Sequence, residues 1–467
     1  MSGDLLQYIR TGVPLNLKQQ LRLTIQLSTP AIMAQLSSIV MQYIDASMVG
    51  SLGADASASI GLVSTSTWLF WGIGSAAATG FSVQVAHSIG AGDNKRARNI
   101  LRQALTSILL LSLTLLVIGC SISHSLPMWL GGTPSITKDA TSYFLIFSLS
   151  IPFFLLNYLG GSMLRCSGNM HIPSILNVLM CVLDVILNLF LIFPSRELSI
   201  LGWNIIFPGA GLGVIGAALG TALAELVIAI AMIGFLCFRS PVMKLTLEQG
   251  SFLPEKRCIR NALHISLPMG GEHIVLCAAQ IMTTVIVAPL GTLSIAANSF
   301  AITAESLCYM PGYGIADAAT TLVGQSIGAK RTDLARRFAR ITVLMGMAIM
   351  TFMAVVMYVA APLMMVIMTP NVEVQALGVM ALRTEAFAEP MFAAAIVAYG
   401  VFVGAGDTLI PSGMNLFSIW AVRLTLAAWL APTMGLQGVW IAMCIELCFR
   451  GSIFLIRLRW GKWIKTL

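Results

Sequence analysis

Long apolar runs are the feature that most constrains this chain. A helix of about 20 apolar residues spans the hydrocarbon core of a bilayer. Such runs lie near residues 24–50, 58–86, 101–121, 140–163, 172–193, 212–238, 262–290, 294–324, 339–367, 377–403, 409–431 and 436–456. With 57% hydrophobic and only 10% charged residues, the composition is outside the range of soluble domains. We therefore predict an all-α membrane protein with about twelve transmembrane helices.

The basic residues predict how these helices are oriented. Lys and Arg precede the first predicted helix, follow the second, sixth and eighth, and end the chain, whereas loops such as 53–55 and 291–294 nearly lack them. By the positive-inside rule, both termini are cytoplasmic, and the chain is a multi-pass protein of the cytoplasmic (inner) membrane. The net charge of +8 therefore reports membrane orientation and not nucleic-acid binding. No signal peptide is predicted.

An internal repeat organises the chain. Four residues recur 238 positions later: Pro30 as Pro268, Gly53 as Gly291, Gly90 as Gly328, and Pro173 as Pro411. This constant register predicts a duplicated six-helix unit. Because each copy has an even number of spans, the two lobes share one orientation and are related by pseudo-twofold symmetry, with a substrate site between them. We place the N-terminal lobe at 1–238, a cytoplasmic linker at 239–261 and the C-terminal lobe at 262–467. The register breaks at a longer outer loop, 194–211.

A polar stripe crosses the first predicted helix. Gln35, Ser38, Gln42 and Asp45 recur at helical spacing, so they share one face. A carboxylate at this depth costs on the order of 2.5–3.5 kcal/mol, so such acids usually face a bundle interior or a watery cavity. A polar seam between two helices would explain the Gln and Ser residues but explains the acid poorly. We favour a functional role for Asp45.

The fifth predicted helix carries a second stripe, because Asp184 and Asn188 stand four residues apart and share a face with Asn177. Acids are frequent in the other spans, and the main deep base is Arg423, which we expect to pair with an acid or a helix carbonyl. A surplus of carboxylates attracts cations into a cavity of low dielectric. For Glu225 and Glu446, a structural role and a functional role are equally compatible with the sequence. We expect the substrate cavity to be lined by Gln35, Gln42, Glu272, Gln280, Glu305 and Glu389.

The Cys and His residues show no metal-binding or catalytic motif. The nine Cys include no CxxC pair, and the five His show no HExxH spacing. We therefore predict no metal site, no cofactor and no enzymatic activity. An intramembrane enzyme ranks last among the functions considered.

Several motifs carry a resemblance to a known family. These are IDASMVGSLG, HSIGAGDNKRAR, LRCSGNMHIP and GLGVIGAALGTA in the first half, and GQSIGAKR, GAGDTLIP, IWAVRL and GLQGVWIAM in the second. In this order, they resemble the multidrug and toxic compound extrusion (MATE) family across essentially the whole chain. The resemblance implies two six-helix lobes around a V-shaped cavity that alternates between membrane faces. It also implies export of organic, often cationic and amphiphilic compounds in exchange for Na⁺ or H⁺, by a monomer surrounded by membrane lipid.

The resemblance assigns roles to particular residues. Asp45 matches a first-helix acid that takes part in cation coupling in a bacterial branch of the family, and Asp184, Asn177 and Asn188 become its partners. The family often has Asn four residues before Asp here, whereas this chain has the reverse order. Glu272 and Glu389 lie about one turn before the positions of key acids in another branch.

Two questions stay open in the sequence. A desolvated carboxylate suits proton exchange, whereas several carboxylate and amide oxygens together suit a hard cation such as Na⁺. The alternative function is a flippase or exporter of a lipid-linked or natural-product precursor, which would need several basic residues in its cavity. This chain shows mainly acids there.

Overall fold

The computed structural model describes residues 2–200 and 203–464. The first half of the chain contains eight α-helices and one β-hairpin within these residues. They are α1 (Ser2–Thr11), α2 (Leu17–Gly50), α3 (Ala54–Gly90), α4 (Asn94–Ile122), α5 (Leu126–Trp129), α6 (Pro134–Cys166), α7 (His171–Leu191), β1 (Pro194–Ile200), β2 (Trp203–Ala210) and α8 (Val214–Gly234), which continues as a π-helical turn, Phe235–Arg239.

The second half is helical throughout its described residues. A 3₁₀ turn at Leu245–Leu247 precedes α9 (Lys256–Val287), which ends in another at Ala288–Leu290. The remaining helices are α10 (Thr292–Gly328), α11 (Thr332–Met368), α12 (Val372–Ala386), α13 (Glu389–Gly404), α14 (Leu409–Phe417), a π-helical segment at Ser418–Leu424, α15 (Thr425–Met434) and α16 (Leu436–Trp460).

The membrane spans agree with the prediction. Among the described residues, ten helices are long and apolar enough to cross a bilayer, counting α14 and α15 as one. The pair α12 and α13, bent by 61° at a short break, supplies another. The remaining predicted span, α10, is not among these helices, but its 37 residues match the length of its repeat counterpart α3. Acidic residues such as Glu305 and Asp317 lower its mean hydropathy. It packs against α2 of the other lobe in the way that α3 packs against α9.

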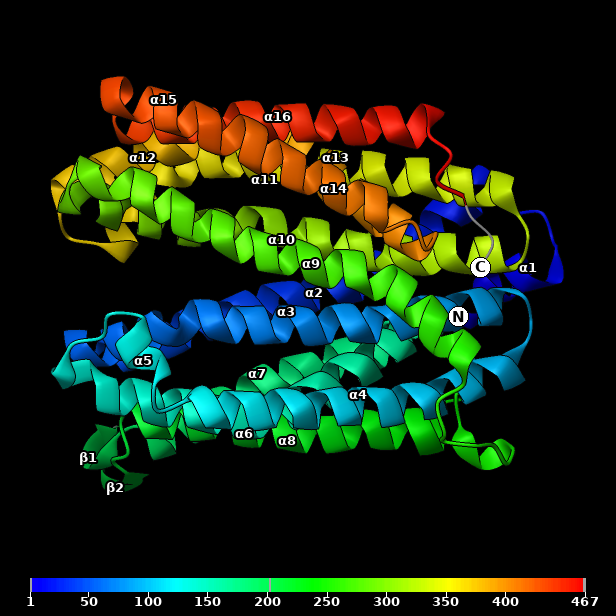
Figure 1. Ribbon diagram of the computed structural model, residues 1–467, viewed down its shortest axis with the longest axis horizontal. Helices are drawn as coiled ribbons and strands as arrows, with labels where there is room; N and C mark the ends of the chain where they lie inside the picture. The colour runs from blue at the N-terminus through cyan, green and yellow to red at the C-terminus, as the bar shows by residue number, and fades with distance from the viewer. Residues whose placement is uncertain (1, 201–202, 465–467) are drawn as a thin grey trace.

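The helices form two lobes, as the repeat predicts. Figure 1 shows α2 to α8 in one half of the molecule and α9 to α16 in the other, with both termini at the same end. The lobes meet where α2 packs against α10 and where α3 packs against α9, which are equivalent contacts under the repeat. Each lobe has its own apolar core, centred for example on Phe144 in the first and on Trp440 in the second.

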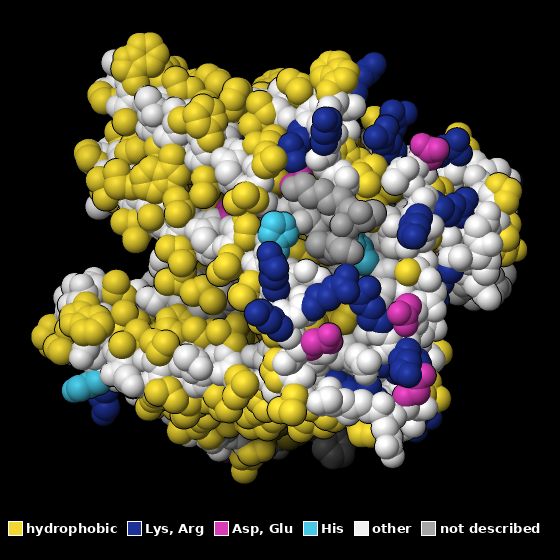
Figure 2. Space-filling model, turned by 45° about the vertical axis from the view of Figure 1, so that its right-hand side comes forward, with side chains coloured by type: hydrophobic (Ala, Val, Ile, Leu, Met, Phe, Trp, Pro, Cys, Tyr) yellow, Lys and Arg dark blue, Asp and Glu magenta, His cyan; other side chains and the backbone are white. Residues whose placement is uncertain are grey.

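One face of the molecule is rich in Lys and Arg. This basic face is formed by both termini and by the chain around Lys95, Arg257 and Lys330. Figure 2 shows its dark blue side chains together, and a hollow between the two lobes at the edge away from them. The molecule is therefore open on one side only.

The lobes are closed near the basic face by a close crossing of α3 and α10. A Cβ atom on Gly90 would lie 2.0 Å from the carbonyl oxygen of Gln325, and one on Gly328 would lie 2.0 Å from that of His87. Only glycine permits such backbone contact, and the repeat places one on each helix. Ile327, near the crossing, is only 2% exposed, so the lobes are tightly packed at this end.

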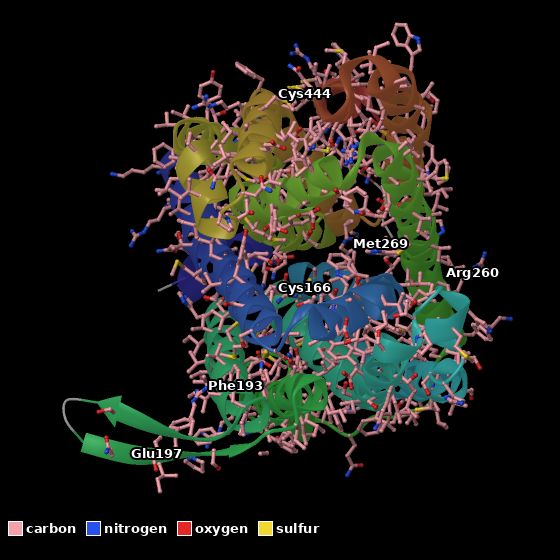
Figure 3. The ribbon with its side chains drawn as sticks, turned by 90° about the vertical axis from the view of Figure 1, so that its left-hand side faces the viewer. Cys166, Phe193, Glu197, Arg260, Met269 and Cys444 are labelled. Atoms are coloured by element: carbon pink, nitrogen blue, oxygen red, sulfur yellow. The ribbon has the colours of Figure 1, made fainter. Side chains whose placement is uncertain are left out.

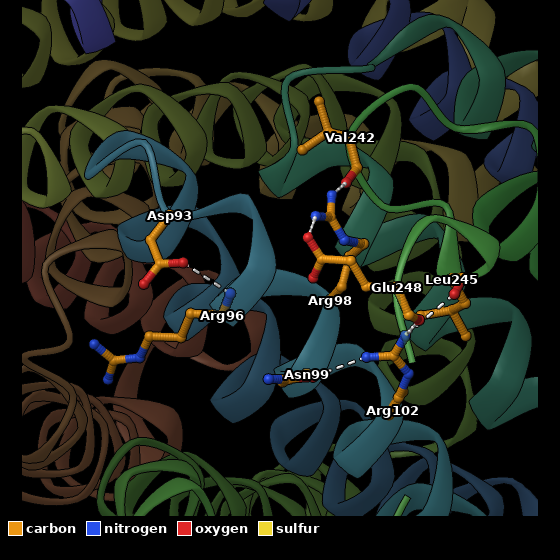
Figure 4. A network of polar contacts seen from close by, with 8 residues as sticks. All are labelled: Asp93, Arg96, Arg98, Asn99, Arg102, Val242, Leu245 and Glu248. Carbon is orange, nitrogen blue, oxygen red and sulfur yellow. Dashed lines mark hydrogen bonds and ion pairs between the residues drawn. The ribbon is translucent and has the colours of Figure 1, made fainter. Parts of the chain in front are cut away.

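The segment between the lobes is fastened to α4. Arg98 donates to the carbonyl oxygen of Val242 at 3.0 Å and to Glu248 at 2.9 Å, and Arg102 donates to the carbonyl oxygens of Leu245 and Glu248 (Figure 4). These charge-assisted bonds hold the linker on the first lobe. The predicted linker, 239–261, overlaps α9, which already begins at Lys256.

The longer loop of the first repeat contains an ordered hairpin. Strands β1 and β2 pair antiparallel, with Arg196 opposite Phe207 and Glu197 opposite Ile206. Arg196 lies over the rings of Phe193 and Phe207, which fastens the base of the hairpin to the end of α7. Figure 3 shows the hairpin extending sideways from the first lobe, near Phe193.

Candidate functional site

Two carboxylates and one amide meet between α2 and α7. Asn188 Nδ2 donates to Asp45 Oδ1 at 2.9 Å and to Asp184 Oδ2 at 3.2 Å. Asp184 and Asn188 are buried, and Asp45 is partly exposed. Gly220 of α8 leaves room for the amide, since a Cβ there would lie 2.0 Å from Asn188 Oδ1. The structure thus brings together three of the four residues predicted for cation coupling.

The fourth predicted residue, Asn177, lies two turns earlier on α7. It lines a small cavity of about 40 Å³ between α2 and α7, together with Gln35 and Ser38 of the predicted stripe. Arg165 and Asp317 complete this cavity, and their ion pair of 3.8 Å joins the two lobes. The polar seam between α2 and α7 therefore runs from the Asp45 network to the lobe interface.

A second polar cavity, of about 130 Å³, adjoins Asn177 inside the first lobe. Its acid is Glu225 of α8, which accepts a hydrogen bond of 2.7 Å from Asn157 of α6. Trp71 and Tyr158 form part of the wall and contact each other edge to face. A cavity of this size and polarity has room for several water molecules.

Glu272 of α9, which we predicted to line the substrate cavity, is buried with partners for both oxygens. It accepts hydrogen bonds of 2.7 Å from Tyr399 and from Asn415. Gln42 and Gln280, also predicted for the cavity, are exposed side chains of α2 and α9.

Glu305 and Glu389, the remaining predicted cavity acids, meet a third acid inside the second lobe. Glu305 of α10, Glu385 of α12 and Glu389 of α13 have carboxylate oxygens within 4.8 Å of one another. Glu385 and Glu389 are fully buried, and neither has a hydrogen-bond partner among the described residues. The 61° break between α12 and α13 lies between these two acids and turns both toward α10. Three buried carboxylates this close need protons or a cation among them.

The predicted pairing of Arg423 is confirmed. Its guanidinium binds Glu446 at 2.6 Å, and Arg450 binds the other oxygen of the same carboxylate at 2.7 Å. Ser418 donates a further hydrogen bond to Glu446 at 2.5 Å. Glu446 therefore has a structural role, because it holds the guanidinium groups of Arg423 and Arg450 in place.

Comparison with known proteins assigns the chain to a family. The MatE family model matches residues 30–190 and 268–429, which together cover more than half of the chain. The chain belongs to the MATE family of membrane transporters. The two matched segments begin at Pro30 and Pro268, the first residues of the internal repeat.

Several MATE-type relatives match almost the whole chain. It is 25% identical to a probable multidrug resistance protein NorM of Thermotoga maritima, over 94% of this chain and 92% of that protein. It is 24% identical to the multidrug resistance protein MdtK of Edwardsiella ictaluri, over 95% and 96% of the two chains. A solved structure described as the outward-facing conformation of a MATE transporter has a TM-score of 0.86 at 20% identity and covers 97% of each chain. This likeness confirms the fold.

Glu385 is the one residue of the acid clusters that was not predicted as a site residue of this MATE protein. Glu385 stands four residues before Glu389, which would have placed both on one face of a continuous helix. Cys and His motifs gave no sign of this cluster, because its members are carboxylates from three different helices.

Proposed function

We propose that the protein is a cation-coupled antiporter that exports organic, mainly cationic compounds by alternating access between its two lobes. The hydrogen-bonded group of Asp45, Asn188 and Asp184 is the observation that carries this proposal. These polar residues lie in spans whose other residues are largely apolar, where acids are retained chiefly for ion and proton pathways.

The chemistry of this group suits a coupling ion. Its two carboxylates share a single amide donor, so bringing both negative charges together is costly unless a proton or a cation lies between them. Binding H⁺ or Na⁺ there would draw α2 and α7 together, and release would let them separate. Since α2 also packs against α10 at the lobe interface, such a movement would shift α2 relative to α10.

The charges of the cavity favour cationic substrates. Among the described residues, the bases that lie near the acids of the spans are already engaged: Arg165 pairs with Asp317, and Arg423 and Arg450 pair with Glu446. Glu385 and Glu389 have no hydrogen-bond partner among the described residues, and Glu305 lies beside them. A flippase for phosphate-bearing lipids would need free basic side chains in the cleft, so this pattern supports the exporter over that alternative.

The direction of transport follows from the basic face. Lys and Arg loops mark the cytoplasmic side of membrane proteins, so both termini would be cytoplasmic and the open side would face outward. Names of relatives such as the multidrug resistance protein MdtK support drug-like substrates. Labelling of a cysteine at position 95, in Lys95→Cys, should succeed only from the cytoplasmic side of the membrane.

The decisive experiment replaces Asp45 with Asn. Purified protein in liposomes would be given a pH gradient or a Na⁺ gradient separately, with ethidium as the transported cation. Asp45→Asn keeps the shape of the side chain and removes its charge, so we expect at least a tenfold loss of gradient-driven transport with an unchanged melting temperature. The gradient that drives the wild type identifies the coupling ion.

Asp55→Asn is the matched control, because Asp55 is an acid in the first turn of α3 outside this group. It should transport like the wild type. If Asp45→Asn moves ethidium at the normal rate under both gradients, Asp45 is a structural residue and the proposed coupling is wrong.

A further inference from the structure

An apolar groove opens on the outer surface of the second lobe, between α14 and the end of α16 nearest the basic face. Its volume is about 710 Å³, within the range of ligand-sized sites. Gly413 and Phe417 of α14 form one wall, and Phe449, Ile453 and Ile456 of α16 form the other. Phe417 is 59% exposed and Ile456 53% exposed, so the groove faces the surrounding bilayer.

The groove exists because α14 leans away from α16. At the opposite end the two spans pack closely, since a Cβ on Gly438 would lie 2.6 Å from the carbonyl oxygen of Leu430. Near the basic face, α14 turns toward α9, and Asn415 donates to Glu272. Gly413 adds no side chain to the gap, and a Cβ there would meet no atom within 4 Å.

Something apolar must fill this space in a membrane. Lipid tails are as apolar as the groove, so an acyl chain gains no hydrophobic energy by entering it. An unfilled groove, however, would forfeit the dispersion contacts of both helix faces. The occupant is therefore a lipid chain, and what selects one lipid over another must lie at the headgroup end.

The headgroup end of the groove is basic. Trp460 lines the groove and is 73% exposed, which is typical of an aromatic residue at the membrane interface. Arg459 lies over its ring at 5.4 Å, and Lys462 follows, exposed. Arg457 is already paired with Asp407, but Arg459 and Lys462 have no acidic partner among the described residues.

We propose that this groove is a binding site for one anionic phospholipid of the leaflet on the basic side. One acyl chain lies between α14 and α16, and the phosphate lies at Arg459 and Lys462. The bound lipid would brace α14, the helix that carries Asn415 to Glu272. The site is separate from the acid clusters and does not depend on which ion drives transport.

Native mass spectrometry of the full-length protein tests this site. The protein would be titrated with phosphatidylglycerol and phosphatidylcholine of identical chains. We expect one phosphatidylglycerol to bind in preference, by about fivefold for each basic residue at the headgroup. Gly413→Phe fills the groove and should remove this binding event for both lipids. Arg459→Gln should weaken phosphatidylglycerol binding about fivefold and leave phosphatidylcholine unchanged.

Two control variants match these changes elsewhere on the surface. Gly234→Phe adds the same ring at a glycine of α8 that also has open space, and Arg340→Gln removes an exposed charge from α11. Both should bind lipid like the wild type, and all variants should keep the wild-type melting temperature. Equal binding of the two lipids by the wild type, or binding that Gly413→Phe and Arg459→Gln leave unchanged, would overturn the proposal.

Discussion

Asn188 decides how Asp45 and Asp184 share their charge, because its amide donates to both carboxylates. Hydrogen bonds to charged groups contribute about 1.5–3 kcal/mol each. Asn188→Leu keeps the volume and removes both donors, so we expect at least a tenfold loss of ethidium transport in liposomes. Asn204→Leu, on the exposed hairpin, is the control. Normal transport by Asn188→Leu would mean that the two acids work without a shared donor.

The acids of the second lobe should differ in what they contribute to stability. Glu385 is fully buried without a hydrogen-bond partner among the described residues and lies beside two other carboxylates. Glu385→Gln removes like-charge repulsion, so we expect the melting temperature in sodium-free buffer to stay the same or rise.

Glu446→Gln provides the opposite case in the same lobe. It leaves Arg423 and Arg450 without their shared partner, and breaking a buried ion pair in this way costs about 3–5 kcal/mol. Its melting temperature should fall clearly. Equal destabilisation by both changes would mean that the three-carboxylate cluster needs Glu385 as a ligand.

Helical spacing places each set of polar residues on one face of its helix, but it was the resemblance to the family that paired Asp45 with Asp184 and Asn188. Asn177 shares their face but lies seven residues before Asp184, about 10 Å along α7, so it meets α2 beside Gln35 and Ser38. How closely α2 and α7 approach depends on packing with other helices, which spacing does not report.

The helices themselves were predictable for a related reason. A bilayer demands long apolar segments with internal hydrogen bonds, so the spans can be marked from the chain alone. Their irregularities were missed. The break between Ala386 and Glu389 and the π-helical segment at Ser418–Leu424 depend on neighbouring helices that supply partners for the freed backbone groups.

The close crossing of α3 and α10 predicts equal effects for equivalent substitutions on the two helices. Gly90→Ala and Gly328→Ala should each force the helices apart, because a Cβ at either position would lie 2.0 Å from a backbone carbonyl oxygen of the other helix. We expect both variants to lower the melting temperature by similar amounts and to expose the lobe interface to cysteine reagents from the basic side. Gly270→Ala, in open space on α9, should do neither. Unequal effects would argue against equivalent roles for the two glycines.

The arrangement of the lobes followed from the repeat, since a constant register requires equivalent helices to occupy equivalent places. Which side is open did not follow, because under the proposed alternating access both states have the same sequence. The contacts that close the basic face determine which side is open in this structure. They include the N-terminal helix α1, whose side chains Leu6 and Ile9 are buried in the core of the lobe interface.

Helix α1 is fastened to both lobes. Arg10 donates to the carbonyl oxygen of Ser167 in the first lobe at 3.4 Å and to Gln325 in the second at 3.5 Å. Arg331 of the second lobe donates to the carbonyl oxygen of Tyr8 at 2.9 Å. Opening the basic face must break one of these sets of contacts. Helix α1 therefore stabilises the state that is open on the other side.

Distance measurements between the lobes test this role of α1. Spin labels at Lys95 and Asp333, exposed positions made equivalent by the repeat, report how far the lobes separate at the basic face. Ile9→Asp places a charge at a fully buried position, so α1 should detach and a longer distance should become populated. Gln7→Asp puts the same charge on the exposed side of α1 and should leave the distance unchanged. If Ile9→Asp gives the wild-type distances in folded protein, closure of the basic face does not depend on α1 and rests on the direct contacts between the lobes, such as the crossing at Gly90 and Gly328.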